Sequence, residues 1–303
     1  MRVVIAGGTG LIGRALSNDL ATEADAHEII ILSRAPERAM GLPLGARAVR
    51  WDARSADGWA SVVDGADAVV NLAGASLLSL WTGERKRRIR ESRLNVGHAL
   101  VEAVERAGNK PRVLVQASGV DYYGFTGDHM LTEDAPPGES FLARLAVEWE
   151  ASTAPVEGMG VRRAIIRSGL VFSRDGGAFP LMLLPFRLYL GGVLGSGKQW
   201  FPWIHIDDEV RAIRFLIEEE DAHGPYNLTA LGLVTHAELM HAIGRALHRP
   251  TWLRVPAFAV RLVLGQMGSL LLEGQRAAPR RLQGASFEFR FPTADAALHD
   301  LLA

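Results

Sequence analysis

The stretch VVIAGGTGLIG at residues 3–13 decides the fold of this chain. VVIA is a short β-branched run typical of a buried strand, and the glycine-rich segment then leads into the helical pattern LIGRALSNDL. Another strand-like run, EIIIL at 28–32, follows, so the pattern predicts a βαβ unit. Gly7, Gly10 and Gly13 would permit a tight turn and close approach of the backbone to a pyrophosphate at the helix N-terminus. The spacing predicts a dinucleotide site, with a tight packing turn as the alternative.

Strands and helices continue to alternate along the chain. Strand-like runs occupy 46–51, 66–73, 111–118 and 161–172, and helical patterns occupy about 82–107 and 140–153. Continuously apolar strands between amphipathic helices indicate a parallel sheet that is covered on both faces. We therefore predict an α/β fold, a Rossmann-type doubly wound parallel sheet with a small substrate and C-terminal lobe.

The composition changes after Phe172 to glycine, proline and large apolar residues, which suits a loop-and-helix lobe closing over a site. Helical patterns resume at 207–219 and 236–248, and FEFRF at 287–291 alternates like a half-buried strand before a closing helix. We predict a Rossmann domain over 1–168, completed by about 203–230, and a small lobe with a C-terminal domain made of 169–202 and 231–303.

The residues after the second strand favour NADP over NAD. An acidic residue about twenty positions beyond the glycines would bind the ribose 2′-hydroxyl of NAD, but the sequence has Ser33 and Arg34 there. A guanidinium suits a 2′-phosphate because it offers forked donors and a fixed charge, although Arg34 has a solvated loop charge as its alternative role. Asp52 is placed to reach an adenine edge. The predicted cofactor-binding residues are Gly7, Thr9, Gly10, Leu11, Ile12, Gly13, Ser33, Arg34, Asp52, Asn71, Ala73 and Gly74.

Composition excludes several classes of function. The chain has 303 residues, 48% of them hydrophobic, and can therefore fill a sizeable core. The formal net charge is −1 and the basic residues are scattered except in ERKRRIRESR at 84–93, which argues against nucleic acid as the main partner. The absence of cysteine excludes disulfides, thiol nucleophiles and cysteine-ligated zinc, and we predict no metal site.

The longest apolar stretch does not match a membrane span. It covers 257–272 and is interrupted by Arg261 and Gln266. We expect a packed helix pair or a partner-facing surface, which is compatible with a homodimer, and no membrane partner. Because the first strand begins at Arg2, we expect no signal peptide and a cytoplasmic protein.

These motifs resemble the short-chain dehydrogenase/reductase superfamily in its extended, epimerase-like branch. The matching residues are GGTGLIG, NLAG at 71–74, Ser118 with YYG at 122–124, RSGLVF at 167–172 and WIHIDD at 203–208. Further matches, from Trp81 with its following helix to GGVLGSGKQW at 191–200 and GQRAAPRRL at 274–282, are similar to the YfcH-like epimerase family, which has an uncharacterised C-terminal domain. The resemblance covers essentially the whole chain and implies a Rossmann domain that binds NADP.

The superfamily's usual catalytic pair is missing. In its members a serine polarises the substrate, and a Tyr-x-x-x-Lys pair on one helix face moves the proton. The matching stretch, ESFLARLAVEWE at 139–150, has Phe141 and Leu145 at those positions. No lysine follows any tyrosine by four residues; the tyrosines are Tyr122, Tyr123, Tyr189 and Tyr226, and the lysines are Lys86, Lys110 and Lys198.

Ser118 remains as a candidate, at the C-terminal end of the fifth strand where open parallel sheets bind ligands. We predict that Ser118 orients the reacting oxygen and that Tyr122 or Tyr123 donates the proton. A phenol without a neighbouring cation is a poor base at neutral pH, so this design suits the reductive direction.

Other polar and aromatic residues have two interpretations each. Arg144 could bind a substrate anion or lie on a solvated helix face, and Arg167 could touch the cofactor or act as a buried structural partner. His205 titrates near neutrality, but we favour a structural role for the WIHIDD segment. The residues that could form an aromatic pocket with a polar pair, or an ordinary core, are Trp81, Trp200, Trp203, Phe179, Phe186, Phe201, Gln275 and Arg276.

The sequence therefore predicts an NADP(H)-binding oxidoreductase or epimerase-like enzyme of atypical catalytic design that acts on a small molecule. A different class of protein, a catalytically silent NADP(H)-binding sensor or interaction protein, is the alternative. A sugar-nucleotide epimerase of the usual mechanism is a weaker option because the Tyr-x-x-x-Lys pair is absent.

Overall fold

A seven-stranded parallel sheet forms the centre of the protein in this computed structural model, which describes residues 1–22 and 27–303. The strand order is β11-β7-β5-β4-β1-β2-β3, and every pairing in the sheet is parallel. This is the doubly wound order expected of a Rossmann fold, so the predicted fold class is confirmed. The strands are β1 (Arg2–Ala6), β2 (Glu28–Ser33), β3 (Ala46–Arg50), β4 (Ala68–Asn71), β5 (Val113–Gly119), β7 (Arg162–Ser168) and β11 (Gly224–Leu228).

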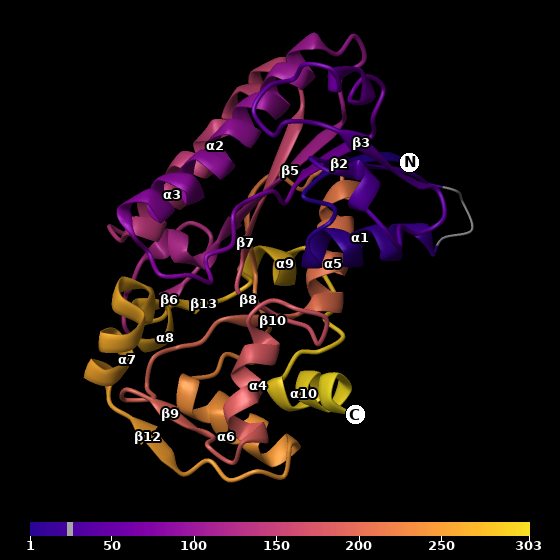
Figure 1. Ribbon diagram of the computed structural model, residues 1–303. Helices are drawn as coiled ribbons and strands as arrows, with labels where there is room; N and C mark the ends of the chain where they lie inside the picture. Colours follow the sequence, from indigo (N-terminus) through magenta and orange to yellow (C-terminus); the bar gives the residue numbers. More distant parts are fainter. Residues whose placement is uncertain (23–26) are drawn as a thin grey trace.

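Helices cover both faces of the sheet (Figure 1). Helices α1 (Leu11–Ala21) and α5 (Ile206–Glu218) pack together on one face, where Leu16 and Ile213 are fully buried against the β-branched side chains of the strands. Helices α2 (Gly83–Arg106) and α3 (Phe141–Ser152) cover the other face. The strands are buried on both sides, which explains why they read as continuous apolar runs.

The helix ends follow from capping side chains. The hydroxyl of Thr82 accepts a hydrogen bond from the Arg85 backbone N–H at 3.2 Å and starts α2, and Ser140 does the same for α3. Each such cap stabilises a helix by about 1 kcal/mol. The predicted helix boundaries near 82 and 140 therefore agree with the structure.

The remaining elements gather mainly below the carboxyl ends of the central strands, where α4, α6 and α10 surround a second core (Figure 1). Phe172, Phe179 and Trp203 stack in this core with ring centroids about 5 Å apart, at 4.8 and 5.1 Å. The helices are α4 (Phe179–Arg187), α6 (His236–Ala246), α7 (Ala257–Leu264), α8 (Ser269–Leu272), α9 (Arg280–Gly284) and α10 (Ala294–Leu302). The paired short strands are β8 (Leu170–Phe172) with β10 (Trp203–His205), β9 (Gly192–Leu194) with β12 (Leu253–Val255), and β6 (Met130–Leu131) with β13 (Arg276–Ala277).

Two predicted strands differ from the structure. The run 161–172 divides at Gly169 into β7, in the main sheet, and β8, which pairs with β10 instead. The predicted strand at 287–291 does not form, because the buried carboxylate of Asp208 accepts the backbone N–H groups of Arg290 and Phe291 at 2.8 and 2.9 Å. Its aromatic alternation packs this irregular segment against α5 instead.

Helix α7 carries an exposed apolar face. On α7, the side chains of Phe258, Leu262 and Val263 are 72, 83 and 71% exposed. Within the described residues, no helix has the length and apolar character needed to cross a membrane.

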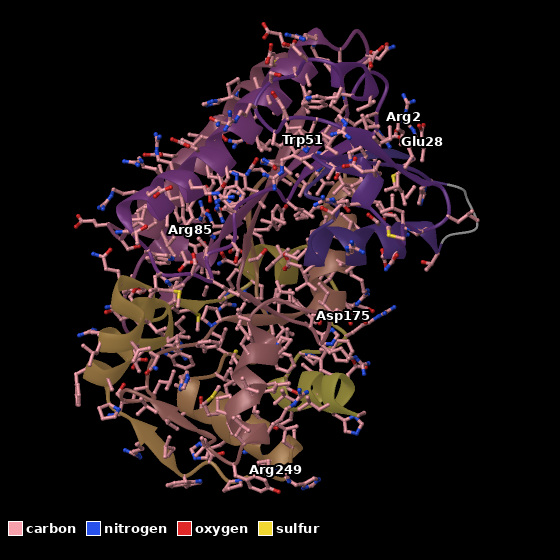
Figure 2. The ribbon with its side chains drawn as sticks, viewed as in Figure 1. Arg2, Glu28, Trp51, Arg85, Asp175 and Arg249 are labelled. Atoms are coloured by element: carbon pink, nitrogen blue, oxygen red, sulfur yellow. The ribbon has the colours of Figure 1, made fainter. Side chains whose placement is uncertain are left out.

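Figure 2 shows Arg2 close to Glu28, at the opposite end of the molecule from Arg249. The distance between Arg2 Nε and Glu28 Oε2 is 2.7 Å, so this ion pair joins the start of β1 to the start of β2.

Candidate functional site

The glycine loop after β1 has the geometry of a phosphate-binding turn. Gly7 has φ +84°, and a Cβ there would lie 2.7 Å from the Leu72 carbonyl carbon of the neighbouring strand end. A Cβ on Gly13 would lie 2.5 Å from the Gly7 oxygen, so only glycine lets α1 pack this closely on the loop. Gly10 precedes α1 without a side-chain cap, which leaves the first N–H groups of the helix open to an anion.

A cavity of about 610 Å³ lies beside this loop. It is bounded by the glycine loop and by the carboxyl ends of β4, β5 and β7. Helix α3 contributes an apolar wall of Leu142, Leu145, Ala146 and Trp149. On the side away from the sheet, Met182, Trp200, Phe201, Met267, Leu270 and Gln275 close it. The position that would hold the superfamily's lysine, Leu145, is thus an apolar wall of the cavity, whereas Phe141 packs edge-on against Trp81 with ring centroids 5.7 Å apart.

The predicted cofactor-binding residues fall into two groups: those that line the cavity and those that lie behind or beside it. Those that line the cavity are Gly7, Gly10, Leu11, Ile12, Gly13 and Gly74. Asn71 is fully buried behind them, and its side chain accepts the Ala73 N–H at 3.2 Å and donates to Gln116 at 2.9 Å. Asn71 therefore holds the 72–74 turn in place instead of presenting its amide to the cavity.

Ser33, Arg34 and Asp52 lie at the ends of the neighbouring strands β2 and β3, outside the cavity lining. The Ser33 hydroxyl accepts the Ala35 N–H at 3.2 Å, and Arg34 is exposed. Asp52 accepts the N–H groups of Ser55 and Arg54 at 2.9 and 2.8 Å, and these hydrogen bonds lower its pKa. Thr9, at the tip of the glycine loop, is exposed.

Ser118 lines the cavity but also belongs to a buried ionic cluster. Its hydroxyl donates to Glu150 Oε1 at 2.7 Å. Both oxygens of Glu150 accept from the guanidinium of Arg167, each at 2.9 Å. Burial opposes the charge on Arg167, but the hydrogen bonds to Glu150 outweigh it and raise the pKa of the guanidinium. In this arrangement the Ser118 oxygen can accept a hydrogen bond from a ligand, while its proton points to Glu150.

The structure separates both candidate tyrosines from the cavity. Tyr123 is 1% exposed, and its hydroxyl donates to Asn227 at 2.6 Å and accepts from Arg167 at 3.1 Å. Burial raises the pKa of Tyr123 to about 12. The ring of Tyr122 lies under the Arg167 guanidinium, 3.4 Å from its carbon, and neither tyrosine lines the cavity. The loop leads the two phenols into the Arg167 cluster, because a buried guanidinium is stabilised by aromatic faces and hydrogen-bond acceptors.

Four ionisable residues that line the cavity were not among the predicted site residues. Arg93 lies in the basic run 84–93, but its guanidinium is buried 4.7 Å above the Trp149 ring and lines the cavity. Its position four residues after the buried Ile89 was a usable signal, since such residues share a helix face. Asp121 lies on the cavity wall too, and burial raises its pKa to about 6 against the effect of Arg93. Glu209 in α5 and Glu273, directly after α8, are the other two.

The other sequence candidates are structural. His205 precedes α5, where its Nδ1 accepts the Asp207 N–H at 3.1 Å, so the favoured structural interpretation agrees with the geometry. Arg144 is exposed and donates to the Glu139 carbonyl. Of the aromatic set, Trp200 and Phe201 line the cavity, whereas Trp81, Trp203, Phe179 and Phe186 pack away from it.

Two buried polar atoms on the cavity walls lack hydrogen-bond partners among the described residues. They are Nε1 of Trp149 and Oε2 of Glu209. A buried polar group without a partner costs about 1–3 kcal/mol, so these atoms are suited to a ligand that supplies polar groups. No group of three metal-ligating side chains occurs in the part of the chain that the structure describes.

A glycine loop at the start of a doubly wound sheet, opening on a cavity at the strand ends, defines a dinucleotide-binding α/β protein. The model of the NAD dependent epimerase/dehydratase family matches residues 3–229, and a domain of unknown function, DUF1731, matches residues 255–301. The chain belongs to the NAD dependent epimerase/dehydratase family.

Two relatives match over nearly their whole length. The epimerase family protein SDR39U1 of Mus musculus is 37% identical over 308 residues, covering 100% of both chains. The epimerase family protein SSP1921 of Staphylococcus saprophyticus is 40% identical, covering 99% of this chain and 98% of the relative. The crystal structure of human SDR39U1 with NADPH superposes with a TM-score of 0.90 at 36% identity, covering 100% of this chain and 99% of that one.

Proposed function

We propose that this protein is an NADP(H)-dependent oxidoreductase or epimerase-like enzyme that acts on a small molecule without a Tyr-x-x-x-Lys pair. The observation that carries the proposal is that the glycine loop and Ser118 open into one cavity of about 610 Å³. A site of this kind brings a dinucleotide and a second ligand together at the carboxyl ends of the strands. The human relative whose structure contains NADPH supports the choice of cofactor.

The residues present fit a bound dinucleotide. The close packing at Gly7 and Gly13 leaves backbone, with no side chain, beside the open N-terminus of α1, where a pyrophosphate would lie. Arg34 and Ser33 would hold the 2′-phosphate and Asp52 the adenine edge, while Leu11, Ile12, Ala73 and Gly74 would contact the rest, with Thr9 at the loop tip. When bound, the cofactor supplies hydride chemistry.

The protein's own contribution would be orientation and exclusion of water. Ser118 would accept a hydrogen bond from a substrate hydroxyl, and its orientation is held by Glu150. The apolar wall of α3 with Trp200 and Phe201 would shield the reacting centre. Neither Tyr122 nor Tyr123 lines the cavity, and burial raises the pKa of the Tyr123 hydroxyl. Of the three predicted catalytic residues we therefore propose a role for Ser118 only.

The test combines binding with turnover. Purified protein is titrated with NADPH and NADH. Turnover is followed through the absorbance of the reduced cofactor, with alcohols and NADP⁺ and with carbonyl compounds and NADPH, in the wild type and in the Ser118→Ala and Tyr123→Phe variants. We expect NADPH to bind more tightly than NADH, and turnover to fall with Ser118→Ala far more than with Tyr123→Phe. Weak binding of both dinucleotides would reject the proposal that this protein depends on NADP(H).

A catalytically silent NADP(H)-binding sensor is the second candidate. It is favoured by the location of both tyrosines in the Arg167 cluster, which leaves the cavity without a phenol. Tight NADPH binding without turnover of any compound, together with partner capture that depends on NADPH, would support it.

A further inference from the structure

Glu209 is a buried carboxyl without a charged partner at the cavity. It lies in the first turn of α5, is 0% exposed and lines the cavity. Its Oε1 accepts a hydrogen bond from the Ser168 hydroxyl at 2.6 Å, and its Oε2 has no partner among the described residues. A ligand in the cavity is therefore the group that can complete the hydrogen bonds of this side chain.

The surroundings of Glu209 make its neutral form the stable one. Burial raises the pKa of Glu209 to about 8, and the Ser168 hydrogen bond opposes this only in part. The ionisable residues on the elements packed against Glu209 have other partners or face away: on α1 Arg14 and Asp19, on β7 Arg162, Arg163 and Arg167, before α5 His205, and on α5 itself Asp207, Asp208, Arg211 and Arg214. None of them forms an ion pair with Glu209 in the described structure, so its proton responds to whatever occupies the cavity.

The position along the sheet edge indicates which part of a dinucleotide would reach Glu209. Its hydrogen-bond partner Ser168 ends β7 and pairs with Gly119, the residue after Ser118. A pyrophosphate at the start of α1 with the adenosine half toward Ser33 on β2 directs the other half across β4 and β5 toward β7. The nicotinamide half would therefore extend to the end of the cavity that contains Ser118 and Glu209.

We propose that Glu209 contacts the nicotinamide end of the bound dinucleotide and couples the oxidation state of the dinucleotide to proton binding. This inference rests on the proposed function. The reduced nicotinamide ring is uncharged, so the neutral carboxyl remains and donates from Oε2. The oxidised ring carries a positive charge, which favours the carboxylate. Binding of NADP⁺ therefore releases the Glu209 proton to solvent, whereas binding of NADPH does not.

Calorimetry in two buffers of different ionisation enthalpy measures the protons released on binding. The wild-type protein should release more protons with NADP⁺ than with NADPH at neutral pH. Protons from the 2′-phosphate cancel in this difference, because both dinucleotides carry that group. In Glu209→Gln, a neutral isostere that keeps the packing, the difference should vanish. It should persist in Asp207→Asn, which removes an exposed acid from the same helical turn.

The same coupling predicts a pH-dependent preference. As the pH rises through the neutral range, the ratio of the NADP⁺ to the NADPH dissociation constant should fall by up to about tenfold per pH unit in the wild type. The ratio should be independent of pH in Glu209→Gln. Equal pH dependence in the variant would point to Asp121, which also titrates on the cavity wall, and would overturn the proposal. Tight binding of both dinucleotides without this dependence in the wild type rejects the inference alone, whereas absence of binding rejects the proposed function with it.

Discussion

Two buried glutamates lie on opposite sides of strand β7 and have opposite surroundings. Glu150, from α3, is bound by both arms of the Arg167 guanidinium and by Ser118. The carboxyl of Glu209, from α5, accepts a single hydrogen bond among the described residues, from the Ser168 hydroxyl. Arg167 and Ser168 are consecutive in β7, and successive side chains of a strand point to opposite faces. One residue step therefore separates a paired carboxylate from an unpaired carboxyl.

The difference shows how burial can serve two purposes in one protein. A buried carboxylate with a bidentate arginine locks neighbouring elements together, because breaking the pair leaves an uncompensated charge. A buried carboxyl without a cation stays neutral and changes its protonation when a charge arrives. The first arrangement positions Ser118, and the second leaves a group that can respond to a ligand.

Breaking the Glu150 pair should have the largest effect. Arg167→Met removes the guanidinium and leaves Glu150 buried without a cation, so the free energy of unfolding in urea should fall by about 3–5 kcal/mol. The double variant Arg167→Met, Glu150→Leu should recover part of this loss. Arg144→Met, at an exposed arginine, should change stability by less than about 0.5 kcal/mol. If Arg167→Met lowered the free energy of unfolding by less than about 0.5 kcal/mol, as expected for the control, a structural role for the Glu150–Arg167 pair would be contradicted.

Glu209→Gln should change stability in a pH-dependent way. Because the pKa of Glu209 rises from 4.5 to about 8 on folding, the folded state binds its proton more tightly, and wild-type stability falls as the pH rises through this interval. The glutamine variant lacks this loss, so its free energy of unfolding relative to the wild type should grow by up to about 1.4 kcal/mol per pH unit and level off above pH 8. Urea unfolding at several pH values measures it, with Asp207→Asn as the control. Parallel curves for wild type and Glu209→Gln would exclude a neutral Glu209.

Ser118→Ala should have a moderate effect on stability. Glu150 keeps both bonds to Arg167 after the hydroxyl is lost, so the free energy of unfolding should fall by only about 1 kcal/mol. NADPH affinity should stay close to that of the wild type in a fluorescence titration, because the glycine loop is unchanged. A stability loss as large as that of Arg167→Met would instead show that Ser118 contributes as much to the buried ionic cluster as the ion pair of Glu150 and Arg167.

Ser168→Ala should have the smallest effect and should sharpen the contrast between the two sides of β7. The Ser168 hydroxyl lowers the pKa of Glu209, so its removal should move the pH at which stability levels off to a higher value. When urea unfolding of Ser118→Ala is measured over the same pH range, its stability should level off at the same pH as that of the wild type, because Ser118 contacts the other glutamate, Glu150. If stability levelled off at the same pH in the wild type, Ser168→Ala and Ser118→Ala, the Ser168 hydroxyl would not influence the pKa of Glu209.

Much of the fold was predictable because its signals are local. Residues 3–13 and 28–32 predicted the first βαβ unit through glycine spacing and β-branched runs, and Thr82 and Ser140 start helices through their own hydroxyl groups. FEFRF at 287–291 has the alternation of a strand, but the N–H groups of Arg290 and Phe291 donate to Asp208 instead. Asp208 lies too far away in the sequence for these hydrogen bonds to be predicted.

The sequence by itself determined the doubly wound sheet, the glycine loop and the missing catalytic pair, because each depends on residue types at short spacing. The tertiary structure alone decided which polar groups meet. Tyr123 follows Ser118 by five residues, yet its hydroxyl bonds to Arg167 and Asn227, while Arg93 from a basic surface run is buried at the cavity. Burial and pairing set the charge state of each carboxyl, and both arise only when distant elements pack together.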